Sequence, residues 1–537
     1  MRRKMDFTPS GNKALISRLV LVISVLIFTY LALQLTPFLP DDSYISFRYA
    51  ENLALGNGLT FNAGETPVEG YTNFLWILLC SLAVRLGLDL PSFVPHLGLF
   101  FGILNLLVFW LIIRPRLSAG QQMLVMLLLS SSGPFVLYSI SGMETPLFSL
   151  LILIATLCVD RIIHDGRPVW SISLAVVCTL LTLCRPEGLL LYPAVVGYLI
   201  LARYLKPMNG YHSYSRMRWM LAGLGLFALL VLVYQSWRLM YFGEIFPTPL
   251  LSKGGDGQSL LHAWNINIQF FFLIQNRYFA PLGYYYIALG VVALIGVLIP
   301  CSSKNNRPLF ENTIFALLVI YASLYVNFVD WMPGMRYFVP LIPLLLIAGL
   351  PVLRALLPRA LSMSYKRELP HLALCTAFVV LNLSFVALLR FDAIRNETST
   401  QESLVALGEW LRDNVPAETL LAISDVGATP YYSKLATVDI NPKSLTDIHI
   451  VKQGWSEEYF FSRRPGIVVL VSFSLAEPNF YTKHKVLVAD PRFIDQYRLI
   501  GKTRYDWYYD RSYWVFAHKT LPFTYQQLSS LPKGVGN

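Results

Sequence analysis

Charged residues are scarce in this 537-residue sequence: Asp, Glu, Lys and Arg make up only 14% of it, whereas they make up about a quarter of a soluble domain. This shortage excludes an ordinary soluble protein. Cysteine is also scarce, and the six cysteines form no C-x-x-C pair. Neither a disulfide framework nor a cysteine-ligated metal site is therefore indicated. The sequence has no visible internal repeat and no low-complexity segment.

Hydrophobic residues are abundant instead, at 55% of the chain, with a mean hydropathy of +0.52. They gather in repeated apolar runs of about 17–25 residues, each long enough to cross ~30 Å of hydrocarbon. We therefore predict a polytopic α-helical membrane protein with about 11–13 transmembrane helices.

Lys and Arg divide the connections between these runs into two sets, one with 19 basic residues and the other with five. The positive-inside rule places the richer set, which includes the N-terminus, in the cytoplasm. If the C-terminal part lies outside, the number of crossings must be odd. We expect eleven crossings, with the run at 73–90 lying partly in the interface. The net charge of +11 falls on residues 1–396, so it indicates topology and not nucleic-acid binding.

Residues 397–537 form a different kind of segment, with 15 acidic and 15 basic residues. The pattern at 402–415 predicts a helix, and 419–424, 435–440 and 466–473 are typical of short buried strands. We predict a small α/β domain over 397–537 on the outer side, following a transmembrane domain over 1–396. The two long outer loops are then 36–72 and 241–279.

The first outer loop carries five acidic residues, Asp41, Asp42, Glu51, Glu65 and Glu69, against a single Arg48. Chance accumulation of acids in a cation-poor loop is one explanation. The other starts from local structure, because the apolar spacing predicts a helix over 43–55 with Asp41, Asp42 and Ser43 at its N-cap. Two carboxylates at a membrane boundary suit a reaction that deprotonates a hydroxyl or holds a divalent cation.

Further charged residues fall on the same side of the membrane: Glu144, Arg185, Glu187, Lys253, Asp330 and Arg336. Taken singly, such a cation is usually an interfacial anchor and such an acid is usually solvated. Taken together, they suggest paired and functional charges, as polar groups in membrane proteins usually are. Carboxylates beside separate cations suit a reaction with an anionic leaving group and a hydroxyl acceptor.

These residues resemble the GT-C class of membrane glycosyltransferases, most closely the branch of the terminal arabinofuranosyltransferase. Aminoarabinose transferases and protein O-mannosyltransferases are more distant. The branch pattern D-D-x-Y-I-x-F-R-x-A is met by 41–50, and V-E-G-Y-T-N/H-x-L-W by 68–76. Supporting stretches lie at 138–148, 184–191, 334–343 and 424–440. One motif departs, because Pro247, Thr248 and Pro249 stand where relatives read P-N-T before the lysine. The backbone contact there is in doubt.

The resemblance implies an enzyme that moves a sugar from a polyprenyl-phosphate donor to an acceptor hydroxyl, on the outer face of a bacterial inner membrane. It makes Asp41 the general base, with Asp42 as its neighbour or the alternative base. Both could also hold a divalent cation, Mg or Mn. The implied donor-phosphate ligands are Lys253, Arg336 and Arg185. The implied substrate-binding residues are Arg48, Glu69, Tyr71, Glu144, Glu187 and Asp330.

Two other classes stay open. A transporter or flippase of lipid-linked sugars would place its polar residues at the midplane and tends to show internal repeats. A non-catalytic assembly protein would use the outer domain and would not need Asp41. The sugar, and whether the acceptor is a glycan, lipid or protein, are not determined by the sequence.

Overall fold

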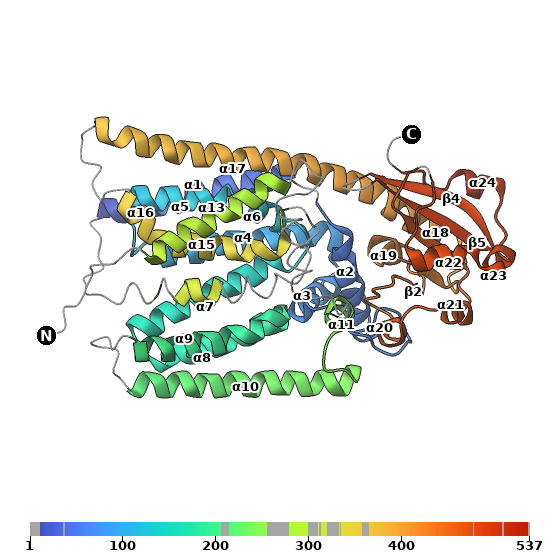
Figure 1. The fold of residues 1–537 in the computed structure, drawn as a ribbon, viewed down its shortest axis with the longest axis horizontal. Coiled ribbons are helices and arrows are strands. Elements are labelled where there is room, and N and C mark those ends of the chain that lie inside the picture. The colour runs from blue at the N-terminus through green and yellow to red at the C-terminus, as the bar shows by residue number, and fades with distance from the viewer. Residues whose placement is uncertain are drawn as a thin grey trace.

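The computed structural model describes residues 11–35, 38–205, 214–254, 279–298, 310, 313–318, 332, 334–356, 365–475, 477–506 and 510–534. Helices aligned along the long axis form a transmembrane part, and a domain that contains a β-sheet lies at one end of it (Figure 1). The predicted fold class, a helical membrane protein with a small C-terminal α/β domain, is confirmed.

The first half of the transmembrane part contains α1 (Gly11–Leu35), α2 (Asp41–Ala54), α3 (Phe74–Arg85), α4 (Leu90–Ile113), α5 (Ala119–Ser130), α6 (Gly133–Tyr138), α7 (Thr145–His164), α8 (Pro168–Cys184), η1 (Pro186–Leu190) and α9 (Leu191–Leu205). The second half contains α10 (Tyr214–Phe242), α11 (Thr248–Gly254), α13 (Phe279–Leu298), η3 (Arg336–Leu341), α15 (Ile342–Ala348), α16 (Leu350–Leu356) and α17 (Tyr365–Ser399).

Among these described helices, five stretches are long and apolar enough to cross a membrane: Ala14–Leu35, Leu90–Ile113, Thr145–His164, Met217–Phe242 and Arg336–Arg354. Several shorter apolar helices accompany them. The protein is therefore a multi-pass membrane protein. The predicted total of 11–13 crossings includes segments outside the described residues and stays a prediction.

Local signals in the sequence explain where several helices begin. The carboxylate of Asp89 caps α4 by accepting a hydrogen bond from the backbone N–H of Ser92 at 3.1 Å. Ser118 and Gln121 form a capping box at the start of α5. Proline occupies the first turn of α7 and of α8, a position where its missing N–H leaves no helical hydrogen bond unmade.

The helix within the apolar run at 73–90 is too short to cross a membrane by itself. Its helix α3 has 12 residues, which at 1.5 Å per residue covers about 18 Å, well short of the hydrocarbon core. The next helix, α4, makes the crossing: the indole N–H of Trp110 near its end donates to the carbonyl of Ser17, near the start of α1, at 3.1 Å. The short α3 agrees with eleven crossings, and the interfacial position of 73–90 stays a prediction.

No loop separates the last transmembrane helix from the first helix of the C-terminal domain. The π-helix η4 (Thr400–Val405) joins α17 directly to α18 (Ala406–Asn414). The strands are β1 (Leu421–Ile423), β2 (Thr437–Asp439), β3 (Ile467–Ser472), β4 (Tyr497–Asp506) and β5 (Asp510–His518). The remaining helices are α19 (Ala428–Ser433), α20 (Ile448–Gln453), α21 (Glu457–Arg463), α22 (Thr482–Ala489), α23 (Pro491–Gln496) and α24 (Tyr525–Ser529).

The five strands form one mixed sheet in the order β2-β1-β3-β5-β4. Strand β1 is parallel to β2 on one side and to β3 on the other, whereas β5 is antiparallel to both β3 and β4. The three predicted strands are present. Strands β4 and β5 were not predicted, because β4 lies at the sheet edge and mixes buried with exposed residues.

Alternation along the central strands gives the sheet two different cores. Leu421, Ile423 and Val469 belong to a set of buried side chains that continues into the transmembrane helices. Ala422 and Val468, which point the other way, belong to a separate core under α21 to α23. One face of the sheet is therefore packed into the same core as the membrane helices.

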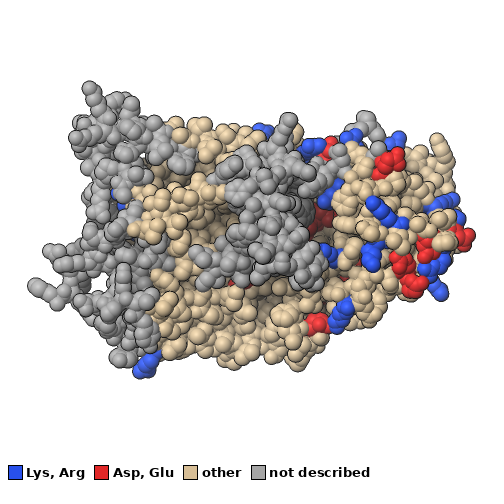
Figure 2. All heavy atoms as spheres, viewed as in Figure 1, with Lys and Arg blue, Asp and Glu red and all other residues tan. Residues whose placement is uncertain are grey.

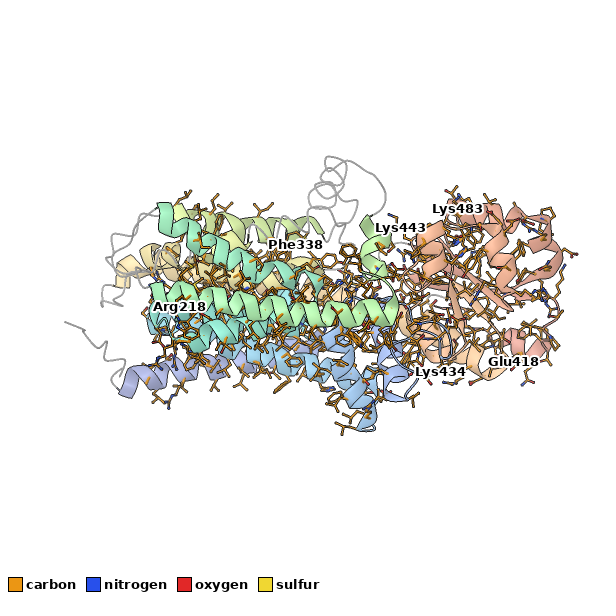
Figure 3. The ribbon with its side chains drawn as sticks, turned by 90° about the horizontal axis from the view of Figure 1, so that it is seen from below. Arg218, Phe338, Glu418, Lys434, Lys443 and Lys483 are labelled. Carbon is orange, nitrogen blue, oxygen red and sulfur yellow. The ribbon has the colours of Figure 1, made fainter. Side chains whose placement is uncertain are left out.

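Charged side chains gather on the C-terminal domain, while the described part of the transmembrane surface in this view is mostly uncharged (Figure 2). Arg218 lies at the opposite end of the molecule from Lys434, Lys443 and Lys483 (Figure 3). Arg218 is in the basic set that the charge pattern assigns to the cytoplasm, so the C-terminal domain lies at the end of the bundle remote from this residue.

Candidate functional site

Helix α2 lies across the junction between the transmembrane part and the C-terminal domain, next to α19 (Figure 1). It begins at Asp41, two residues before the predicted start, and Pro40 is its N-cap residue. Asp41 and Asp42 are thus in the first helical turn and make no side-chain cap, which corrects the predicted capping role. Their carboxylates benefit from the helix dipole and are available to partners from other elements.

The carboxylate of Asp41 is half-buried and faces the C-terminal domain. Its Oδ1 accepts a hydrogen bond of 2.7 Å from the backbone N–H of Ala428, at the start of α19. The preceding Gly427 packs so closely that a Cβ there would lie 2.3 Å from Asp41 Cγ. Burial, aided by the nearby carboxylates of Asp425 and Asp42, raises the pKa of Asp41 to about 7, although the hydrogen bonds from residues 427 and 428 lower it.

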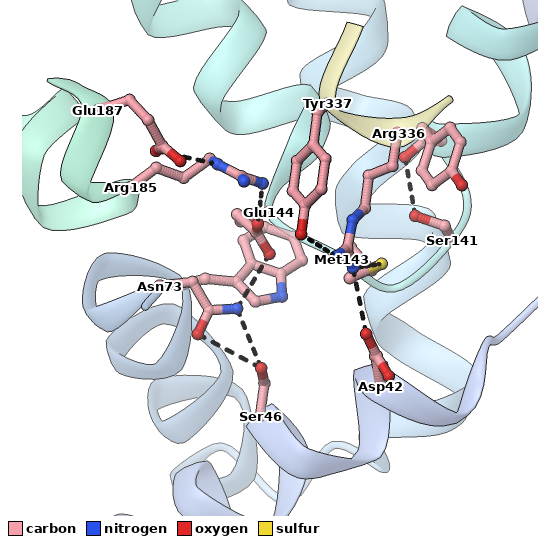
Figure 4. Close-up of polar contacts among 12 residues, drawn as sticks. Asp42, Ser46, Asn73, Ser141, Met143, Glu144, Arg185, Glu187, Arg336 and Tyr337 are labelled. Atoms are coloured by element: carbon pink, nitrogen blue, oxygen red, sulfur yellow. Dashed lines mark hydrogen bonds and ion pairs between the residues drawn. The ribbon is translucent and has the colours of Figure 1, made fainter. Parts of the chain in front are cut away.

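The neighbouring Asp42 has a different partner. Its Oδ2 lies 3.3 Å from Nη1 of Arg336, and the arginine side chain is 8% exposed against 31% for the aspartate. Nη2 of Arg336 donates to the hydroxyl of Tyr337 at 2.8 Å, and Nη1 also reaches the sulfur of Met143. The resulting ion pair joins α2 to η3 and leaves the carboxylate partly open to solvent (Figure 4).

A second arginine lies on the other side of the Tyr337 ring (Figure 4). The guanidinium of Arg185 is 5.0 Å from the centre of that ring, and that of Arg336 is 4.8 Å away. Arg185 pairs with Glu144 at 2.7 Å and with Glu187 at 3.4 Å. The structure therefore brings Asp42, Arg336, Arg185 and two glutamates into one cluster. Both glutamates form ion pairs with Arg185.

A chain of hydrogen bonds links this cluster back to α2. The other carboxylate oxygen of Glu144 accepts from the side-chain amide of Asn73, whose amide also donates to the hydroxyl of Ser46, each at 3.0 Å. Asn73 lies in the V-E-G-Y-T-N stretch and Tyr337 directly follows Arg336. Both were missed as candidates, although each lies inside or next to a motif that the sequence displays.

Arg48 is bound by other parts of the protein, and its predicted role in substrate binding stays a prediction. It is buried, and its guanidinium makes four hydrogen bonds, to the carbonyls of Phe61, Pro430 and Leu435 and to the side chain of Asn62. Two of these carbonyls belong to the C-terminal domain. Arg48 therefore fastens α2 to that domain, and its donors are satisfied by protein acceptors.

Glu69 is likewise occupied by the protein itself. It is buried in an ion pair with Arg238 of α10, which approaches both carboxylate oxygens. Its backbone carbonyl accepts from the N–H and the hydroxyl of Thr248, at 3.1 and 2.8 Å. Thr248 replaces the Asn of the P-N-T motif of the relatives. The backbone contact that this replacement placed in doubt is made here by the threonine.

Of the remaining candidates, Tyr71 packs its ring against Tyr49 at 4.8 Å, and its buried hydroxyl has no hydrogen-bond partner among the described residues. Lys253 is in the short helix α11, but its side chain lies outside the described residues. Asp330 lies outside them altogether. Their proposed roles stay predictions.

A divalent-cation site at Asp41 and Asp42 does not fit the donors present. No group of three or more His, Cys, Asp or Glu side chains is arranged to hold a metal ion in the described part of the chain. One oxygen of Asp41 is bound to the N–H of Ala428, and Asp42 is paired with Arg336. We therefore derive no step of the chemistry through a resident metal.

Residues of the C-terminal domain also reach this junction, which sequence reasoning did not anticipate. Asp425, directly after β1, accepts a 2.7 Å hydrogen bond from the hydroxyl of Tyr513. Arg511 lies 3.9 Å from the same carboxylate. The only available signal was the stretch at 424–440, which marks the start of the domain and assigns no role to these side chains.

Comparison with known proteins gives a fold. A family model described as "Domain of unknown function (DUF8728)" matches residues 392–516. The comparison with curated proteins finds no match. Among solved structures, ArnT from Cupriavidus metallidurans bound to undecaprenyl phosphate has a TM-score of 0.57 at 14% identity, covering 94% of this chain and 99% of that one.

Two further solved structures are similar. The archaeal oligosaccharyltransferase AglB from Archaeoglobus fulgidus, in complex with an inhibitory peptide and a dolichol-phosphate, has a TM-score of 0.55 at 14% identity and covers 86% of this chain and 70% of that one. The arabinofuranosyltransferase AftD from Mycobacteria has a TM-score of 0.48 at 13% identity, with 93% and 40% covered. The first two likenesses show the fold. The third carries no argument, so the branch stays a prediction.

Proposed function

We propose that this protein, whose fold is that of the GT-C glycosyltransferases, is a glycosyltransferase of the bacterial inner membrane. In this proposal it moves a sugar from a polyprenyl-phosphate donor to a hydroxyl of a cell-envelope glycan, glycolipid or protein. Its N-terminus is cytoplasmic, and the C-terminal domain and α2 lie on the outer side. The polyprenyl or dolichol phosphate named with ArnT and AglB supports a lipid-phosphate donor.

One observation carries the proposal: a carboxylate with a near-neutral pKa lies beside an ion pair that is open on its acidic side. Asp41 has a pKa raised to about 7 by burial, so it can accept a proton at physiological pH. The adjacent Asp42 holds Arg336 at the same junction. A transfer that releases a phosphate needs both functions, a base for the hydroxyl and a cation for the leaving group.

The reaction then proceeds in one displacement. The acceptor oxygen attacks the anomeric carbon, and its proton passes to the carboxylate of Asp41. A new bond forms between the acceptor oxygen and the anomeric carbon while the bond from that carbon to the phosphate oxygen breaks. The electron pair leaves with the polyprenyl phosphate, and the anomeric configuration inverts.

Arg336 is the better of the two cations for the leaving phosphate. Among the described residues it pairs with Asp42 at 3.3 Å, and that carboxylate is partly exposed. Arg185 has two carboxylate partners, Glu144 and Glu187, so its charge is already more than balanced. We assign Arg185 and its glutamates to holding the Tyr337 ring, and thereby Arg336, in place. Lys253 remains a proposed further phosphate ligand.

Asp41 is the better base for the same kind of reason. Asp42 is engaged by the guanidinium of Arg336, so one of its oxygens already has a protein partner at the place where an acceptor hydroxyl would have to bind. The position of the cluster, at the end of the bundle next to the C-terminal domain (Figure 1), also favours an enzyme of the outer face over a transporter, whose binding site would lie at the midplane.

The test is release of polyprenyl phosphate from polyprenyl-phosphate sugars by the purified protein in lipid nanodiscs. Asp41→Asn should lower turnover by about 100-fold or more while the protein remains folded by size-exclusion chromatography and thermal melting. Near-normal turnover by Asp41→Asn would remove Asp41 as the base. The same substitution at Asp42 then decides between the two aspartates.

A further inference from the structure

The sheet of the C-terminal domain has one point where the chain connections diverge. From β1 the chain continues through α19 to β2, the neighbour on one side, and then returns to β3 on the other side. In open α/β sheets, ligands bind outside the carboxyl ends of the strands at such a switch point, because the loops there leave in opposite directions. Here the switch point lies between β1 and β3.

This edge of the sheet is turned toward the proposed base. The loop that leaves the carboxyl end of β1 contains Asp425 and Gly427, and Gly427 packs directly on Asp41. The carboxylates of Asp425 and Asp41 are close enough for the first to raise the pKa of the second. A molecule bound at the switch point would therefore have part of its surface beside Asp41.

The side chains at this edge are polar and partly exposed, and Asp425 also accepts the hydrogen bond from Tyr513. Arg511, at the start of β5, lies 3.9 Å from the carboxylate of Asp425, too far for a hydrogen bond. Their side chains are 23% and 21% exposed, so both can be reached from outside. The hydroxyl of Ser424 is buried and has no hydrogen-bond partner within the described part of the chain, which is unusual for a native structure.

An aromatic ring completes the edge. Phe473, the residue after β3, is 36% exposed, so part of its ring can be reached from outside. The guanidinium of Arg511 lies 5.6 Å from the centre of this ring, and Tyr481 supports the ring edge-on at 4.9 Å. An exposed ring face beside a carboxylate and a guanidinium suits a sugar, whose C–H groups pack on the ring while its hydroxyls bind both charges.

We propose that Asp425, Arg511 and Phe473 form an acceptor subsite for a carbohydrate, so that the C-terminal domain presents a glycan hydroxyl to Asp41. The inference rests on the proposed function and narrows its acceptor to a glycan. A lipid acceptor would need an apolar surface instead of this charged edge, and a peptide acceptor would need unpaired backbone groups.

Direct sugar binding tests the subsite without requiring turnover. The probe is a panel of methyl hexopyranosides and methyl pentofuranosides, and the measurement is saturation-transfer NMR on the full chain in nanodiscs. The wild-type protein and Asp41→Asn should bind at least one sugar of the panel. Asp425→Asn and Phe473→Ala should weaken that binding by about tenfold or more, the effect of losing one charge-assisted hydrogen bond or one ring contact.

Matched controls come from the same domain. Glu418→Gln removes an exposed acid, and Tyr525→Ala removes a ring that is 88% exposed; both should bind like the wild type. The subsite is overturned if no sugar binds the wild-type protein, or if Asp425→Asn and Phe473→Ala bind as well as the controls. A failure of the transferase proposal is distinct, because it would appear as no release of polyprenyl phosphate by a protein that still binds sugar.

Discussion

The first outer loop begins and ends in ion pairs of opposite character. At its end, Glu69 and Arg238 are both buried, 5% and 6% exposed, and the guanidinium reaches both carboxylate oxygens. At its beginning, Arg336 is 8% exposed but its partner Asp42 is 31% exposed, and their atoms are 3.3 Å apart. The first pair is closed by protein on every side, whereas the second is open at its acidic end.

The difference shows how the same two chemical groups serve different purposes. A buried, bidentate pair is fixed in geometry, and removing one partner leaves an uncompensated buried charge. An open pair retains solvent on the carboxylate, so an incoming anion can approach the arginine while Asp42 adjusts. We therefore assign Glu69 and Arg238 to holding the loop on α10, and Asp42 and Arg336 to the chemistry.

The strongest test of this comparison is at the residue next to the open pair. Asp41→Asn should lower kcat by about 10²–10⁴-fold, the usual contribution of a general base. The measurement is polyprenyl-phosphate release in nanodiscs, with Glu51→Gln, a partly buried acid of the same helix, as the control. A loss of less than about threefold would contradict the assignment, since general-base removal has larger effects.

A substitution in the closed pair of Glu69 and Arg238 should change the stability of the protein and not its catalytic activity. Glu69→Gln should destabilise the protein by about 3–5 kcal/mol, because Arg238 would be left as an unpaired buried charge. The activity of each folded molecule should stay within about twofold of wild type, since no group of the reaction is removed. Thermal melting and active-fraction titration measure the two effects. Unchanged melting with lost turnover would reverse the assignment of this pair.

A substitution in the open pair of Asp42 and Arg336 should instead lower the catalytic activity. Arg336→Lys keeps the charge but loses the planar fork, and we expect kcat/KM to fall by about 10–100-fold, equivalent to about 1.5–3 kcal/mol. Arg395→Lys, at the ion pair with Asp506 near the start of the C-terminal domain, is the matched control and should leave turnover unchanged. Equal effects of the two substitutions would show that the cluster at Arg336 has no special part in the reaction.

The smallest predicted effect is a shift in the pH profile. Asp41 must be ionised to accept a proton, so kcat/KM should rise with pH and level off above a midpoint of about 7. Asp425→Asn should move that midpoint downward, because it removes a negative charge that raises the pKa of Asp41. A flat profile between about pH 5.5 and 8.5 would contradict a base with a near-neutral pKa.

The same raised pKa has a consequence for stability. Between the ordinary value of 3.8 and about 7, the folded protein keeps a proton on Asp41 that the unfolded chain has released. The contribution of this group to stability therefore falls as the pH rises through that window. Asp41→Asn, which resembles the protonated form, should melt at a higher temperature than the wild type at pH 8, and the difference should disappear near pH 4.

Much of the fold follows from local sequence patterns. The apolar runs predict transmembrane helices because each run satisfies its own backbone hydrogen bonds and is long enough to cross. Strands β1 to β3 were recognisable because they are short, buried and rich in β-branched residues. Strand β4 was not, because it lies at the sheet edge and its polar residues are partly exposed; β5, the inner strand that pairs with it, was missed as well.

The candidate site was predictable only in part. Asp41, Asp42 and Arg336 could be named because they lie in motifs, and the structure brings them to one junction. Arg48 and Glu69 could be named but not interpreted, because their partners Pro430, Leu435 and Arg238 are 382, 387 and 169 residues away in the chain. No spacing rule connects residues at such separations.

The sequence by itself determined the class of protein, the side on which the acidic loop lies relative to the basic connections, and the helical segments, because hydropathy and charge act locally on each segment. Only the tertiary structure decided which partner each of the two adjacent carboxylates faces. Asp41 and Asp42 are adjacent and chemically identical, and they differ because α2 turns one toward the backbone of α19 and the other toward Arg336. Burial and the nearest charge set the pKa of a carboxylate, and both are properties of the folded chain.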